Sequence, residues 1–152
     1  MPKKVRQRTG PEIDQMKLPG ELFEYSLLIR ESHLDTFGHV NNAKYLEILE
    51  EARWELITQN GFGLKDVAKK GMGPVILEVR LSFDKELKLR QRVRITTQCI
   101  GYNRKVGEFE QQILNENNEI CACAIFAFGL FDTRERKLIE PTPEWLHAIG
   151  VS

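Results

Sequence analysis

The sequence has no long apolar run and no excess of charge of either sign. No stretch of its 152 residues approaches the roughly 18 to 20 consecutive apolar residues of a membrane span. Lys and Arg together number 22, as do Asp and Glu, so no overall field attracts nucleic acid or an anionic membrane. These absences make a small molecule the expected partner, rather than a nucleic acid or a bilayer.

Cysteine is also scarce, with only Cys99, Cys121 and Cys123 and no CxxC pair. An odd number without that spacing fits neither a disulfide framework nor a zinc ribbon, and it indicates a reducing, cytoplasmic location. Because Cys121 and Cys123 lie two residues apart in an apolar run, we expect them on one face of a strand as small core residues. A catalytic thiol is the less favoured alternative.

The length of the chain fits one ordinary domain. The first 20 residues carry five basic side chains but lack the apolar centre of a secretory signal, so export is not indicated. We therefore expect an N-terminal tail over residues 1–20 and a single domain over residues 21–152.

Hydrophobic periodicity predicts one long helix between a first strand and a run of further strands. Apolar residues alternate over residues 22–30, which indicates a half-buried strand. The helix is predicted from Asn41 or Asn42 to Asn60, because asparagine caps helix N-termini and Asn60-Gly61 provides a left-handed stop. The remaining predicted elements are a short helix over residues 64–70, strands over residues 75–83, 92–102, 107–114 and 120–131, and a proline-containing loop or edge segment over residues 133–152.

This order predicts an α+β fold in which a curved antiparallel sheet of about five strands wraps around the long helix. The strands after the helix are expected to form a meander, and the architecture is that of a hotdog fold. A single sheet leaves its outer face half covered. We therefore expect a homodimer or homotetramer, in which another copy buries the remainder.

The densest group of polar and titratable side chains lies directly before the long helix. Asp35 stands in a short segment with Gly38 and His39, and Asn41 and Asn42 open the helix. A helix N-terminus presents unpaired N–H groups and a positive dipole end, which stabilise an oxyanion. A carboxylate on the preceding loop can attack the same carbonyl or activate a water against it. Together these features predict acyl transfer.

The residues of this segment resemble a known family. The string Asp35-Thr-Phe-Gly-His-Val-Asn-Asn-Ala-Lys-Tyr45, followed by Glu50-Glu-Ala-Arg53, is similar to the 4-hydroxybenzoyl-CoA thioesterase-like branch of the hotdog superfamily. It is also similar to fatty acyl carrier protein thioesterases. The resemblance covers residues 22–132 and implies an enzyme that hydrolyses the thioester of an acyl-CoA or an acyl carrier protein.

The resemblance implies that Asp35 serves as nucleophile or general base and that the N–H near Asn42 polarises the thioester carbonyl. His39 is either a catalytic group or a structural one that bonds across the loop. Residues of a second subunit are expected to complete the site. The candidate catalytic residues are Asp35, Asn42 and His39, and the candidate substrate-binding residues are Gly38, Asn41 and Tyr45.

Two positions depart from the family pattern. His33 stands where many members have an acidic residue, and Asn42 stands where some bacterial relatives have a histidine, so a mechanism through that histidine does not carry over. Glu50 lies about 12 Å beyond Asn42 along the helix axis, too far to share the carbonyl that Asp35 attacks. We expect it to be a structural partner of Arg53.

Three alternatives stay open. His33, Asp35 and His39 could bind a metal, although their spacing matches no zinc signature and a fourth ligand is missing. A hotdog dehydratase or hydratase would use His39 with a carboxylate, but the usual Asn-Pro between Asp and His is absent. A non-catalytic binder of acyl thioesters would keep the fold and its groove. We expect neither a metal nor a redox cofactor, because the sequence has no ligand set or dinucleotide-binding glycine motif.

Overall fold

The computed structural model describes residues 16–151 of the chain. Most of the predicted N-terminal tail, residues 1–15, therefore lies outside the described residues. Gly20 N donates to Cys99 O at 2.8 Å, and Gln98 Nε2 donates to Gly20 O at 2.9 Å, so the segment that leads into the domain is fixed to the sheet. No helix in the described range is long and apolar enough to cross a membrane.

The long helix α1 (Asn42–Gln59) begins and ends where its capping residues predicted. The Asn41 side-chain oxygen accepts a hydrogen bond from Lys44 N at 3.0 Å and caps the N-terminus. At the other end Asn60 is the C-cap, and Gly61 follows with φ 85°, a conformation that favours glycine. The buried face of the helix consists of Tyr45, Ile48, Leu49, Ala52, Leu56 and Ile57.

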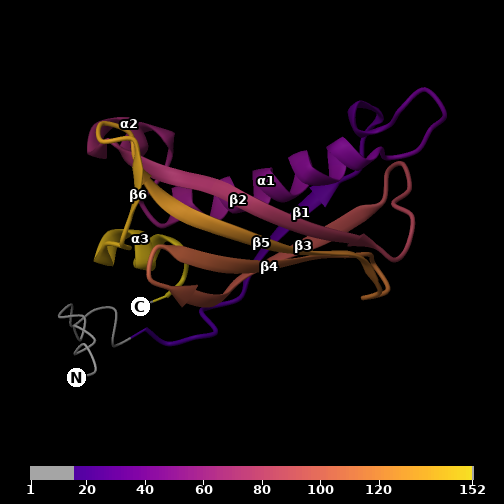
Figure 1. Ribbon diagram of the computed structural model, residues 1–152. Coiled ribbons are helices and arrows are strands. Elements are labelled where there is room, and N and C mark those ends of the chain that lie inside the picture. Colours follow the sequence, from indigo (N-terminus) through magenta and orange to yellow (C-terminus); the bar gives the residue numbers. More distant parts are fainter. Residues whose placement is uncertain (1–15, 152) are drawn as a thin grey trace, which may run out of the picture.

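One sheet of six strands forms the other half of the molecule. Its strands are β1 (Phe23–Leu28), β2 (Met72–Phe83), β3 (Arg92–Asn103), β4 (Val106–Leu114), β5 (Ile120–Asp132) and β6 (Lys137–Ile139). A 3-10 turn, η1 (Glu31–His33), follows β1, and the predicted short helix α2 (Leu64–Lys70) follows α1. An antiparallel sheet beside one long helix confirms the predicted α+β class (Figure 1).

The strand order corrects one prediction. The order across the sheet is β1-β3-β4-β5-β2. Strands β3, β4 and β5 form a meander as predicted, but β2 pairs with β5 and not with β3. β5 is a strongly apolar strand, and its place inside the sheet gives it hydrogen-bonded neighbours on both edges. β2 is exposed over residues 76–80 and takes the edge.

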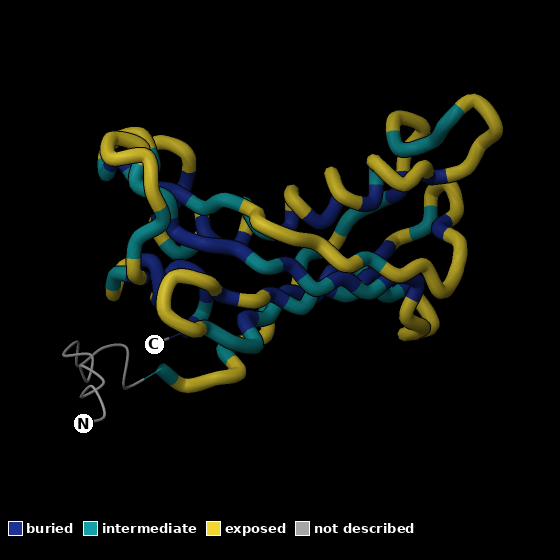
Figure 2. Tube along the Cα trace, in the orientation of Figure 1, coloured by how far each residue is buried: buried dark blue, intermediate teal, exposed yellow. Residues whose placement is uncertain are grey.

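The core lies between the buried face of α1 and the inner face of the sheet, as the dark segments in Figure 2 show. Phe109 of β4 stacks on Phe128 of β5 with ring centroids 4.0 Å apart. Both rings lie beside the C-terminal half of α1, near Trp54 and Ile57. The inner face of the sheet is therefore aromatic at that end of the helix.

The C-terminal segment differs from its prediction. β6 pairs with the end of β5, as an edge segment would, but helix α3 (Pro143–Ala148) follows it where only a loop was expected. Thr142 caps this helix by accepting a hydrogen bond from Trp145 N at 3.2 Å. A proline in the first turn favours a helix start, so Thr142-Pro143 was the overlooked signal. Trp145 is 0% exposed and anchors α3 in the core.

The cysteines confirm only part of their predicted role. Cys99 and Cys121 are buried free thiols, and Cys123 is a free thiol that is only partly buried. Burial raises the pKa of Cys99 to about 11, so this thiol stays protonated at neutral pH. Cys121 is a core residue as predicted, whereas Cys123 lies on the opposite face of β5 from the buried Ala122 and Ala124.

Candidate active site

The loop before α1 is a tight hairpin. Leu34 and Val40 form an antiparallel bridge at its base, and Asp35 N donates to His39 O at 2.8 Å. Gly38 has φ 81°, which a residue with a Cβ adopts only with strain, and its N–H donates to Asp35 O at 3.0 Å. The predicted residues Asp35, Gly38 and His39 are therefore held together in one turn directly before the helix.

The carboxylate of Asp35 is anchored through one oxygen. Its Oδ1 accepts hydrogen bonds from Phe37 N at 2.9 Å and from His39 N at 3.1 Å. Within residues 16–151, Oδ2 accepts no hydrogen bond, and the side chain is half-buried. One oxygen thus shapes the loop, while the other is free to attack a carbonyl or to activate a water.

The first turn of α1 presents free N–H groups. The Asn41 side chain satisfies the N–H of Lys44, but the N–H groups of Asn42 and Ala43 have no acceptor in the described part of the chain. They lie at the positive end of an 18-residue helix. Asn42 therefore offers a backbone donor where the sequence predicted one, and Asn41 acts as the cap.

His39 is paired with a residue that sequence reasoning did not identify. Its Nδ1 lies 2.6 Å from Oε1 of Glu86, which belongs to the loop between β2 and β3. A carboxylate only accepts, so Nδ1 carries a proton, and in the neutral ring Nε2 is left as the acceptor. Because His39 N also donates to Asp35, Glu86 ties the β2–β3 loop to the loop that carries the carboxylate.

Tyr45, a candidate substrate-binding residue, and His33, a residue of the metal alternative, both lie outside the hairpin that carries Asp35. Tyr45 is 5% exposed, and its ring packs edge-on against Phe83 with centroids 4.9 Å apart, so it supports the loop from the core. His33 Nδ1 accepts a hydrogen bond from Arg30 N at 2.9 Å. Among residues 16–151 no three His, Cys, Asp or Glu side chains are grouped as metal ligands, so the residues of the metal alternative are not assembled into such a site.

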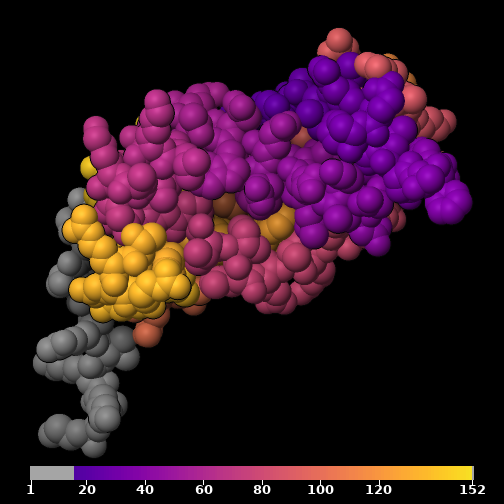
Figure 3. All heavy atoms as spheres, turned by 90° about the horizontal axis from the view of Figure 1, so that it is seen from above, coloured from indigo at the N-terminus to yellow at the C-terminus, as the bar shows by residue number. Residues whose placement is uncertain are grey.

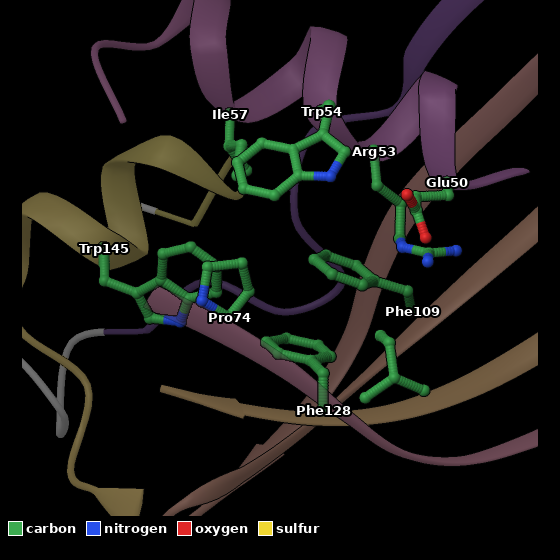
Figure 4. Close-up of a pocket in the computed structure, with 9 residues that line it drawn as sticks. Glu50, Arg53, Trp54, Ile57, Pro74, Phe109, Phe128 and Trp145 are labelled. Atoms are coloured by element: carbon green, nitrogen blue, oxygen red, sulfur yellow. The ribbon is translucent and has the colours of Figure 1, made fainter. Parts of the chain in front are cut away.

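A cavity of about 300 Å³ opens beside the C-terminal half of α1, at the other end of this helix from Asp35. Figure 3 shows a hollow between α1 and β2, with the orange atoms of the strands at its floor. The cavity is lined chiefly by Trp54, Pro74, Ile76, Phe109, Phe128 and Trp145 (Figure 4). Sequence reasoning missed it, because only the strand pairing and α3 bring these residues together.

Two charged residues of α1, Glu50 and Arg53, also line this cavity. The structure shows no ion pair between them, in contrast to the sequence expectation. Arg53 Nη1 instead donates to Gln111 Oε1 at 2.9 Å, and the guanidinium carbon lies 4.1 Å from the centroid of the Phe126 ring. Burial lowers the pKa of Arg53 to about 10, and the Glu50 carboxylate opposes that shift, so the guanidinium remains charged at neutral pH.

Comparison with known proteins identifies the family of this chain. The model of the thioesterase-like superfamily matches residues 29–149, and the chain belongs to that superfamily. Among curated proteins, the long-chain acyl-CoA thioesterase FadM of Escherichia coli strain K12 is 31% identical over 112 residues, which are 73% of this chain and 84% of FadM. The range matched by the superfamily model, residues 29–149, includes the hairpin with Asp35 and the residues that line the cavity.

Solved structures show the same fold. YbaW, a probable thioesterase from Escherichia coli, has a TM-score of 0.74 and 27% identity over 84% of this chain and 98% of its own. A Staphylococcus aureus protein solved in complex with CoA has a TM-score of 0.78 and 16% identity over 88% of this chain and 84% of its own. These likenesses confirm the predicted hotdog fold.

Proposed function

We propose that this protein hydrolyses acyl-CoA thioesters, with Asp35 as nucleophile or general base and the first N–H groups of α1 as the oxyanion site. One observation carries the proposal: the Asp35 carboxylate is anchored by Oδ1 and free at Oδ2, directly before unpaired helix N–H groups. Water is added across the C–S bond, so the acyl carbon gains the hydroxyl and the sulfur leaves as the free thiol of CoA. Membership of the thioesterase-like superfamily supports this reaction.

The proposed substrate is the CoA thioester of a fatty acyl chain, in keeping with the similarity to the long-chain acyl-CoA thioesterase FadM. A carrier protein thioester is the alternative. The apolar cavity beside α1 would receive the acyl chain, because its walls are mainly aromatic and aliphatic. We further propose one domain over residues 21–152 and a cytoplasmic location, which the three free cysteines support.

Release of free thiol from a panel of acyl-CoA substrates tests this function. We expect one thiol for each acyl-CoA that is consumed, together with the free acid. A dehydratase or hydratase would change the acyl group and leave the thioester intact. A non-catalytic binder would bind acyl-CoA and release no thiol, so either result would replace the proposed function.

Replacing Glu86 with Gln is expected to lower kcat/KM a few-fold and to leave the free energy of unfolding nearly unchanged. The His39 and Glu86 side chains are 62% and 56% exposed, so their pairing contributes no more than roughly 1 kcal/mol to stability. The neutral amide no longer fixes the proton on Nδ1, and nitrogen NMR of the His39 ring reports this change. If kcat/KM and the tautomer both stayed the same, Glu86 would have no part in the site.

We also propose that two copies pair through β2. This strand is an edge of the sheet, and its Ile76, Leu77, Val79 and Phe83 are between 40% and 51% exposed. A long apolar edge invites pairing with another strand unless it is protected. Antiparallel pairing of two β2 strands about a two-fold axis would continue the sheet from one copy into the other and cover these side chains.

Such pairing would complete the site across two copies. The Asp35 loop lies near the Phe83 end of β2, because His39 contacts Glu86 just beyond that end. The cavity lies near the other end, at Pro74. In an antiparallel pair the Phe83 end of one β2 faces the Pro74 end of the other. A thioester held at Asp35 of one copy would then extend its acyl chain into the cavity of the partner.

A further inference from the structure

The cavity beside α1 is apolar except at one wall, where two charged side chains face it (Figure 4). Arg53 Nη1 donates to Gln111, and the other N–H groups of the guanidinium have no acceptor within residues 16–151. The carboxylate of Glu50 accepts no hydrogen bond from the described residues either, although it lies close enough to act on the charge of Arg53. A half-buried guanidinium and an exposed carboxylate, each with hydrogen-bonding capacity that no described residue uses, therefore lie together at the edge of the apolar cavity.

The guanidinium of Arg53 is held in place before any ligand arrives. One face lies over the Phe126 ring at 4.1 Å. Gln111, which accepts from Arg53, is 0% exposed, and its Nε2 donates to Leu49 O at 3.0 Å and to Thr97 Oγ1 at 2.9 Å. A donor fixed by such a network loses little conformational entropy when it binds a ligand atom. The free N–H groups are thus preorganised toward the cavity.

We propose that Arg53 binds a hydroxyl group on the acyl chain, so that the protein prefers hydroxyacyl thioesters to unsubstituted ones. This inference rests on the proposed function, because it takes the cavity as the acyl site. The hydroxyl oxygen accepts from Arg53, and the hydroxyl proton is donated to Glu50. A carboxylate on the chain would be repelled by Glu50. A bare methylene chain would leave the guanidinium donors unpaired in apolar surroundings.

The preferred position of the hydroxyl along the acyl chain depends on whether the thioester is held by Asp35 of the same copy or by Asp35 of the partner copy. Arg53 lies about 18 Å from the N-cap of α1 along the helix axis, so a thioester held in the same copy needs its hydroxyl far from the carbonyl. A thioester held by the partner copy approaches from the β2 edge and needs a shorter reach. The hydroxyl position with the highest kcat/KM therefore also reports whether the site is shared between copies.

The test compares kcat/KM for acyl-CoAs of one chain length, unsubstituted or with a hydroxyl at successive carbons. For the wild type, we expect kcat/KM for one hydroxyl position to exceed kcat/KM for the unsubstituted chain at least about tenfold. A single hydrogen bond to a charged donor has an effect of this size. Arg53→Met keeps an unbranched side chain over Phe126 and removes the donors, so it is expected to lose this preference and still hydrolyse the unsubstituted chain. Arg94→Met, which removes a surface cation bonded to Glu24, is the matched control and should keep the preference.

Arg53→Met also leaves Gln111 Oε1 without its donor, which destabilises the fold. Arg53→Lys therefore serves as a second variant and is expected to keep part of the preference.

The measurements on the wild-type protein decide the inference even if both variants unfold. Equal kcat/KM for every chain would overturn the inference and leave the proposed function standing. If no acyl-CoA is hydrolysed, the proposed function fails. The dissociation constants of the same acyl-CoAs then decide the inference, with the same tenfold preference expected in binding and equal affinities overturning it.

Discussion

Replacing Asp35 with Asn is expected to lower the turnover of acyl-CoA at least about 100-fold while the protein stays folded. The amide oxygen of asparagine can still accept the hydrogen bonds that Phe37 N and His39 N donate to Asp35 Oδ1. The substitution removes the negative charge of Oδ2, the oxygen that no described residue binds. Rates of thiol release at saturating acyl-CoA and a thermal unfolding curve measure the two parts of this prediction.

Asp132 provides a matched control for this substitution. Its Oδ1 accepts hydrogen bonds from Arg134 N and Glu135 N, both at 2.9 Å, in the turn between β5 and β6. Asp132→Asn makes the same chemical change in a similar turn and is expected to leave turnover unchanged. His39→Ala should lower turnover less than Asp35→Asn. Hydrolysis at a near wild-type rate by folded Asp35→Asn protein would reject both roles of Asp35 and turn attention to His39.

The elements that depend on neighbouring residues could be predicted from the sequence. Helix α1 runs from Asn42 to Gln59 because Asn41 caps one end and Asn60-Gly61 ends the other, and both signals are local. The hairpin that carries Asp35 was also predictable, since its hydrogen bonds join residues no more than four positions apart. Local capping and turn chemistry therefore located both the carboxylate and the helix N-terminus.

The features that depend on distant pairing could not be predicted in the same way. The place of β2 beside β5 follows from how the whole sheet is filled, and nothing in the alternation of β2 names its neighbour. Glu86 contacts His39 from 47 residues away, which no motif signals. The cavity requires Trp145, and that residue reaches it only because α3 folds back onto the core. Hydrophobic periodicity shows which face of a strand or helix is buried, but it does not show which other strand or helix packs against that face.

Replacing Leu77 with Lys is expected to convert the proposed dimer into monomers and to lower turnover about 100-fold. Without the partner copy the substrate is no longer held in the correct position at Asp35, and misplacement of this kind has an effect of about that size. Leu77 lies near the middle of β2, is 48% exposed, and stands at a bulge where it faces no residue of β5, so the change costs the folded monomer little. In an antiparallel pair the two copies of this position come close to the two-fold axis. Two lysines there repel each other across the interface. Light scattering gives the mass, and thiol release gives the activity.

Leu22→Lys is the control for this experiment, because Leu22 is 57% exposed and precedes β1 at the opposite edge of the sheet. The control variant is expected to stay dimeric and active, since it adds the same charge away from β2. Equal unfolding temperatures for the two variants would show that loss of activity in Leu77→Lys comes from loss of the partner. A fully active monomer of either the wild type or Leu77→Lys would mean that one copy holds a complete site. The acyl chain would then have to reach from Asp35 to the cavity along the α1 of the same copy.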